Sequence, residues 1–183
     1  PAATGAVLTF GNQDRNLTLA GSNAGANTLA AQLTDSAAGQ LGLVKSGAGA
    51  WNVSGSNNTF TGGVTVHAGN LSVKKLVGNG TTTINGGTLK IGPGGAVGDT
   101  ASTSVFVEGG FSVAGGATPA GRLDIGKNGV VFDYTTTSPK AVIAALLVAG
   151  RAGGSWTGNG ITSANAAAAA SSYAVGYGEA SDL

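Results

Sequence analysis

The residues of this chain that could do acid–base, nucleophilic or metal chemistry are few and scattered. Cysteine is absent, which excludes disulfides, thiolate catalysis and cysteine-ligated zinc. His67, the single histidine, lies in an expected strand, where an exposed structural position is the simpler interpretation. Asp124 and Asp133 are the best candidates for a pair of glycosidase carboxylates, but both also fit ordinary solvated strand and turn positions. We therefore predict no catalytic residue, no metal ligand and no cofactor, and a protein that is not an enzyme.

Aromatic side chains offer a second kind of chemistry, because their rings can stack on sugar rings. The candidates for such stacking are Trp51, Trp156, Tyr173 and Tyr177. Isolated aromatic residues more often belong to a core or lie between stacked coils, and a sugar-binding face needs several of them in register on one side. Surface glycans are therefore an alternative partner that the sequence leaves open.

The composition indicates a folded chain without a strong electrostatic partner. Nine basic and eight acidic residues give a net charge of +1, so no overall field attracts nucleic acid or an anionic membrane. No stretch approaches the roughly 20 apolar residues of a membrane-spanning helix, so we predict no membrane insertion. Low charge with 42% hydrophobic residues argues against intrinsic disorder, and the aperiodic glycines with only four prolines exclude a collagen fibre.

A five-residue pattern recurs and predicts short strands. It consists of glycine, any residue, Leu or Phe, any residue, and an aliphatic residue. The pattern occupies residues 39–43, 69–73, 87–91, 109–113 and 121–125. Its alternation places one apolar face inward and polar side chains outward, with glycines at the turns.

Glycine doublets indicate how these strands are arranged. The doublets at 62–63, 86–87 and 109–110 recur after 24 and then 23 residues. We interpret each interval as one coil of an all-β parallel β-solenoid, or β-helix, in which every strand pairs with the strand one turn away. A β-sandwich is the second interpretation, because it also has short strands, but the strand spacing is irregular whereas the doublet spacing is not.

Residues 43–73 resemble a known family. The motifs KSGAG at 45–49, WNVSG at 51–55, NTFTGG at 58–63 and AGNLSV at 68–73 resemble the autotransporter-associated β-strand repeat of bacterial passenger domains. The resemblance implies a right-handed β-solenoid outside the cell, so we expect an extracellular or cell-surface bacterial protein. Residues 121–183 are similar to a module that closes repeat-rich secreted proteins of environmental bacteria.

The pattern changes after residue 134, so we predict coils over residues 1–134 and a C-terminal cap or docking segment over 135–183. Ser138 is the expected N-cap and Pro139 the first residue of a helix that ends at Gly150. Five consecutive alanines at 166–170 favour a second short helix. Val142, Ile143, Leu146 and Leu147 form one apolar stripe on the first helix and are the candidate contact for self-assembly.

Two interpretations of this helix lead to two functions. It either closes the open end of its own solenoid or docks on a neighbouring copy, and the second case generates a head-to-tail homopolymer. We predict an extracellular structural protein, which is a spacer or stalk or the self-assembling fibre subunit of a surface appendage. Its partners are then other copies or neighbouring repeats. The alternative function is an adhesin or a glycan-binding module of a large surface protein.

Overall fold

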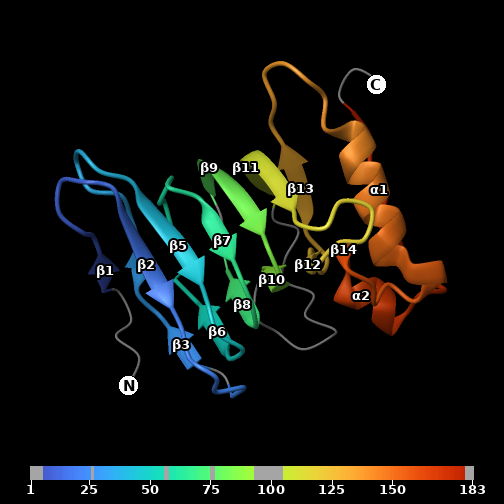
Figure 1. The fold of residues 1–183 in the computed structure, drawn as a ribbon, viewed down its shortest axis with the longest axis horizontal. Helices are drawn as coiled ribbons and strands as arrows, with labels where there is room; N and C mark the ends of the chain where they lie inside the picture. Colours follow the sequence, from blue (N-terminus) through green and yellow to red (C-terminus); the bar gives the residue numbers. More distant parts are fainter. Residues whose placement is uncertain (1–5, 26, 56–57, 75–76, 93–104, 180–183) are drawn as a thin grey trace.

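Two parallel six-stranded sheets dominate the fold. The computed structural model describes residues 6–25, 27–55, 58–74, 77–92 and 105–179. The sheets lie against each other around one core, and α1 (Lys140–Arg151) covers one end of the stack (Figure 1). We call them sheet I, with strand order β13-β11-β9-β7-β5-β2, and sheet II, with strand order β14-β12-β10-β8-β6-β3.

The chain alternates between the two sheets. Sheet I consists of β2 (Arg15–Leu19), β5 (Leu41–Lys45), β7 (Val64–Val66), β9 (Val77–Ile84), β11 (Val105–Val113) and β13 (Gly129–Phe132). Sheet II consists of β3 (Asn27–Leu29), β6 (Ala50–Val53), β8 (Asn70–Val73), β10 (Gly87–Ile91), β12 (Gly121–Asp124) and β14 (Gly160–Thr162). A separate pair joins β1 (Val7–Leu8) to β4 (Gln32–Leu33). Each turn of the chain adds one strand to each sheet, so the expected all-β, solenoid-like architecture is confirmed.

The register of the strands explains the repeated sequence pattern. Leu71, Leu89 and Leu123 are direct neighbours on successive strands of sheet II, and all three are buried. The patterns at 69–73, 87–91 and 121–125 therefore stack on one another, because equivalent apolar residues fill equivalent core positions. The patterns at 39–43 and 109–113 fall in sheet I instead.

The expectation that glycine doublets mark equivalent points of successive coils was wrong. In sheet I, 21 residues separate Leu43 from its partner Val64, 18 separate Val64 from Thr82, and 29 separate Thr82 from Phe111. The doublet at 86–87 begins a strand of sheet II, whereas the doublet at 109–110 lies inside β11 of sheet I. The parallel architecture was right, but the turns between the strands differ in length and do not share one glycine motif.

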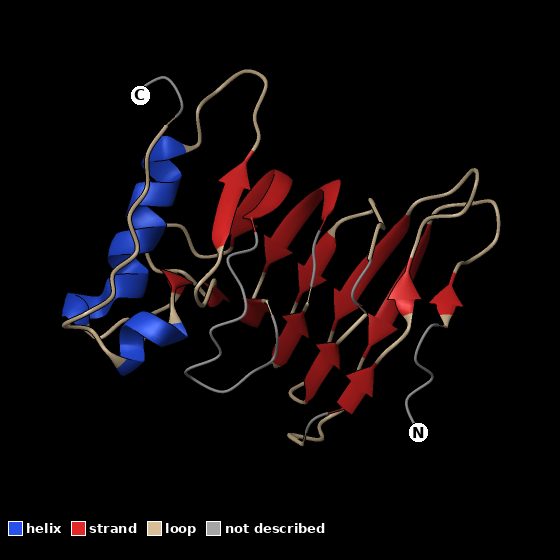
Figure 2. Cartoon of the chain, turned by 180° about the vertical axis from the view of Figure 1, so that it is seen from behind, coloured by secondary structure: helices blue, strands red, loops and turns tan. Residues whose placement is uncertain are grey.

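The C-terminal segment adds a strand as well as helices. After β13 the chain forms α1 and the short turn η1 (Ala152–Gly154), returns as β14 at the edge of sheet II beside β12, and then forms α2 (Ala164–Ala168), which the C-terminal tail follows. Figure 2 shows α1 lying along this end of the stack. Within the described residues 135–179, the C-terminal segment therefore contributes both the last strand of sheet II and the helix that covers it.

Gly150 does not end α1, contrary to our expectation. The helix continues to Arg151, and its C-cap is Ala152, which has a φ of 45°. Gly150 is buried where α1 meets β14, and a Cβ atom there would overlap the carbonyl oxygen of Ile161. The glycine is thus required for close packing of helix on strand rather than for termination.

Asp35 joins two successive coils at a turn. One carboxylate oxygen accepts hydrogen bonds from the amides of Leu41 at 2.7 Å and Thr61 at 3.1 Å, and the other accepts one from the Thr61 hydroxyl at 2.6 Å. Burial of the carboxyl raises its pKa, but these hydrogen bonds outweigh burial and hold the pKa of Asp35 below the usual 3.8. The ionised form therefore stabilises the folded chain.

We expect Asp35→Asn to lower the free energy of unfolding at pH 7 by about 1–2 kcal/mol, because the amide cannot accept all of these hydrogen bonds. The pKa is lower in the folded than in the unfolded chain, so the contribution of Asp35 is complete above pH 3.8 and is lost as the pH falls through the folded pKa. Urea unfolding at pH 7 and at pH 2.5 measures the difference. Asp14→Asn is the control, since Asp14 accepts one exposed hydrogen bond from Gln40. An equal effect of Asp35→Asn at both pH values would contradict this account.

Candidate functional site

The outer face of sheet II carries two rows of polar side chains. Because side chains alternate along a strand, the residues flanking the buried Leu71, Leu89 and Leu123 point outward. One row contains Asn52, Ser72, Lys90, Asp124 and Thr162 on five neighbouring strands. The other row contains Asn70, Thr88 and Arg122 on β8, β10 and β12. These rows form a ladder of hydroxyl, amide and charged groups.

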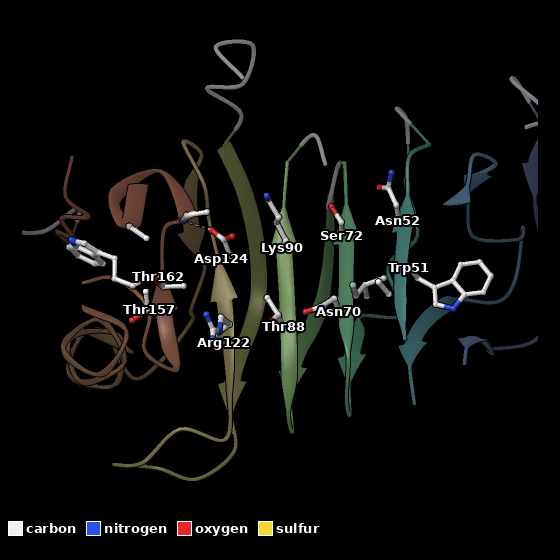
Figure 3. Close-up of a pocket in the computed structure, with 15 residues that line it drawn as sticks. Trp51, Asn52, Asn70, Ser72, Thr88, Lys90, Arg122, Asp124, Thr157 and Thr162 are labelled. Atoms are coloured by element: carbon white, nitrogen blue, oxygen red, sulfur yellow. Dashed lines mark hydrogen bonds between the residues drawn. The ribbon is translucent and has the colours of Figure 1, made fainter. Parts of the chain in front are cut away.

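This face is hollowed into a groove of about 520 Å³. Figure 3 shows the labelled side chains lying across neighbouring strands, from Trp51 on β6 to Thr157 and Thr162 at the C-terminal end. Trp156, Thr157 and two alanines of α2 line that end, so the segment that covers the stack also forms one wall of the groove. We call it the sheet II groove.

The groove carries one net positive charge from Lys90, Arg122 and Asp124. Within the described residues, neither Lys90 nor Arg122 lies within 4.0 Å of a carboxylate oxygen. The carboxylate of Asp124 already binds backbone amides of its own chain. Its Oδ1 accepts hydrogen bonds from the amides of Gly126 at 3.0 Å and Ala164 at 2.9 Å. The carboxylate holds the start of α2, and the two cations remain available to a ligand.

Ser72 stands out among the polar groups of the groove. Its hydroxyl oxygen is buried and, among the described residues, has no hydrogen-bond partner. The register places Ser72 between Asn52 and Lys90 in the same row. Buried polar groups usually have partners, so this hydroxyl is an unused donor and acceptor within the lining of the groove.

The four candidate stacking aromatics do not gather on one face. Trp51 and Trp156 both line the sheet II groove, on opposite sides of the cationic pair. Trp51 is half-buried, and its indole N–H donates to the Ala20 carbonyl at 2.9 Å, whereas Trp156 is only 5% exposed. Tyr173 and Tyr177 are exposed and line a different cavity of about 990 Å³ between β13, α1 and the C-terminal tail. Trp51 is in register with the inward-facing Leu71, so its ring packs against the core and does not lie on the polar face of the groove.

The candidate assembly stripe is mostly covered by the chain itself. Ile143, Leu146 and Leu147 are buried in the common core, and only Val142 is exposed. The physical reason is that α1 uses this face to cover β14, the last strand of sheet II. The three buried residues are therefore not accessible to another copy while the helix is docked.

The side chains considered for catalysis are not brought together in one site. His67 is exposed in the turn between β7 and β8, where its Nδ1 lies 3.3 Å from the side-chain nitrogen Nδ2 of Asn85 in the next coil. Asp133 is exposed just after β13, while Asp124 is committed to backbone amides in sheet II. Among the residues that the structure describes, no three side chains of the metal-binding types lie together.

Sequence reasoning missed Lys90, Arg122 and Lys45 as residues with particular roles. Superposing the repeated pattern at 87–91 on that at 121–125 would have placed Thr88 beside Arg122 and Lys90 beside Asp124 on an outward face. The repeated pattern gave no sign of a hydrogen-bonding role for Lys45. Its alternation position is an inward one, where a lysine is unexpected.

Two comparisons with known proteins bear on the origin of these repeats. Residues 43–73 and 79–91 match the passenger-associated-transport-repeat family. The Adhesin BmaC autotransporter of Brucella suis biovar 1 (strain 1330) is 40% identical over 109 residues, which are 59% of this chain and 3% of that protein. The chain thus spans a small fraction of the curated relative that it matches. No solved structure matches it.

These matches confirm the resemblance found at residues 43–73 and extend it to a second repeat. The chain carries autotransporter passenger repeats, and its place is the bacterial cell surface or the extracellular space. Neither matched description names an enzyme. In the described part of the chain, no helix has the length and apolar character needed to cross a bilayer. The likeness of residues 121–183 to a closing module stays a prediction.

Proposed function

We propose that this chain, which carries passenger repeats of the autotransporter type, is a rigid spacer segment of a bacterial surface adhesin. One observation carries the proposal, namely the unbroken lateral pairing of six parallel strands in each sheet. Each coil buries its neighbour through the same core positions, so the stack resists bending without a large hydrophobic core. We include in the proposal that the coils wind in the right-handed sense, the hand that connections between parallel strands nearly always adopt.

The position of α1 supports a spacer rather than a fibre subunit. A bare last coil would expose the edge of sheet II and pair with another chain, whereas the docked helix covers β14. In Figure 1, β1 and α1 lie at opposite ends of the stack, so a stiff stack holds the two ends of the segment at a fixed separation. The adhesin context is supported by the relative, which is named an adhesin.

Head-to-tail association of copies stays a prediction, but with a different contact surface on α1. Val142 and Val148 of α1 are 56% and 74% exposed, so an association through the helix would use this outer face and not the buried stripe. The spacer proposal needs no such contact.

Distance measurements between spin labels at the two ends test the proposed rigidity. The chain has no cysteine, so Thr28→Cys on β3 and Ala145→Cys on α1 provide two specific labelling sites. Both native side chains are exposed. We expect one narrow distribution of distances in buffer, and a broad one in urea, where the chain behaves as a flexible coil. A broad distribution in buffer would contradict the spacer function.

A further inference from the structure

We propose that the sheet II groove is a binding site for acidic polysaccharide, with Lys90 and Arg122 contacting its anionic groups. The inference does not depend on the spacer function, because a spacer needs no ligand. It starts from the concentration of charge: only 9% of the residues are charged, yet two cations lie on the neighbouring strands β10 and β12 in one groove.

The cations are free to bind an anion. Both side chains are half-buried, and in the described part of the chain neither is paired with a carboxylate. Asp124, their nearest carboxylate in the register, already accepts two backbone hydrogen bonds. Partial burial strengthens the attraction to a ligand, and the guanidinium of Arg122 can hold a carboxylate through two parallel hydrogen bonds.

The remaining lining matches a saccharide rather than a simple ion. Asn70 and Thr88 present an amide and a hydroxyl group beside the cations, and the buried hydroxyl of Ser72, which is in register with Lys90, has no partner among the described residues. Asn52 continues the polar row on β6, two strand spacings from Lys90 on β10, or roughly 10 Å.

These features fit a short stretch of an extended chain that lies across the strands. The acidic groups meet Lys90 and Arg122, and neutral hydroxyls meet the polar rows. Nucleic acid is a poorer fit, because the net charge of the whole chain is only +1.

Titration calorimetry of the purified chain with oligogalacturonate tests the site. Methyl-esterified oligogalacturonate is the neutral ligand control, because it keeps the sugar backbone and loses the carboxylates. We expect the acidic ligand to bind, the ester to bind at least tenfold more weakly, and the affinity for the acidic ligand to fall with added salt. An oligosaccharide of sulfated galactan, tested in parallel, shows whether the natural ligand carries sulfate or carboxylate.

A matched pair of double variants separates the site from overall charge. Lys90→Gln with Arg122→Gln is expected to weaken binding of the acidic ligand at least tenfold. Arg15→Gln with Lys127→Gln removes the same charge outside the groove and is expected to leave affinity within twofold. Circular dichroism and thermal unfolding establish that both variants fold. Equal weakening by both variants, equal binding of acid and ester, or no binding of either acidic oligosaccharide by the native chain overturns the proposal.

Discussion

Gly150→Ala is expected to destabilise the chain by about 3 kcal/mol or more, although alanine is the better helix former. In an exposed helix the same change would stabilise by about 1 kcal/mol. Here the added methyl group meets the carbonyl oxygen and backbone of Ile161, and neither α1 nor β14 can move without breaking the core around Leu146. Gly160 on β14 is restricted in the same way from the strand side, since a Cβ there would overlap the Leu146 carbonyl oxygen of α1.

Urea unfolding followed by tryptophan fluorescence measures this loss, because Trp156 is buried beside the same helix. Ala145→Gly on the exposed side of α1 is the control and should cost only about 1 kcal/mol from helix propensity. Unchanged or increased stability of Gly150→Ala would show that α1 does not pack against β14 as described.

Lys45→Met is expected to lower the free energy of unfolding by about 3 kcal/mol. Lys45 is fully buried in the core column of sheet I, where its ammonium group donates to the carbonyls of Ser46 at 2.8 Å, Gly47 at 2.6 Å and Ala68 at 3.2 Å. The three donors of the ammonium are all used, and they tie one turn to the turn of the next coil. Methionine fills a similar volume but leaves these carbonyl oxygens without donors.

The pH dependence of Lys45 gives an independent check. Burial lowers the pKa of Lys45 below the usual 10.5. The unfolded chain therefore holds this proton more tightly, and the stability of the native chain rises as the pH increases from the lowered pKa toward 10.5. Lys45→Met should lack this rise, whereas Lys74→Met, at an exposed position, should keep it and change stability by less than about 0.5 kcal/mol. Equal unfolding free energies for native chain and Lys45→Met would contradict the account.

Local periodicity was enough to predict short strands and their buried faces, because the core of each coil is narrow and repeats the same apolar positions. The parallel arrangement was inferred from the family resemblance and from the spacing of the glycine doublets, although the doublets do not mark single coils. The pattern at 69–73 and 87–91 specifies which face of each strand is buried, and hence that Leu71 and Leu89 are neighbours. The lengths of the turns were not predictable in the same way. Turns project outside the repeated core, so their glycines serve local conformations or close contacts that differ from coil to coil.

The candidate site was harder to predict because it depends on which coils are adjacent. Lys90 and Arg122 are 32 positions apart in sequence, and only the pairing of β10 with β12 brings them into one groove. The role of Gly150 was misjudged for a related reason. A glycine near a helix end usually terminates the helix, but a strand that comes later in the chain requires the space that the missing side chain leaves.

Deletion of one coil, residues 64–81, tests the central claim of a rigid stack most directly. The register aligns Val64 with Thr82 and Asn70 with Thr88, so the deletion replaces the residues of β7 and β8 by their equivalents in β9 and β10. With spin labels at Thr28→Cys and Ala145→Cys, we predict a distribution that stays narrow and shifts to a distance shorter by about 4.8 Å, one strand spacing. An unchanged distance, or a broad distribution from a chain that no longer folds, would contradict the account.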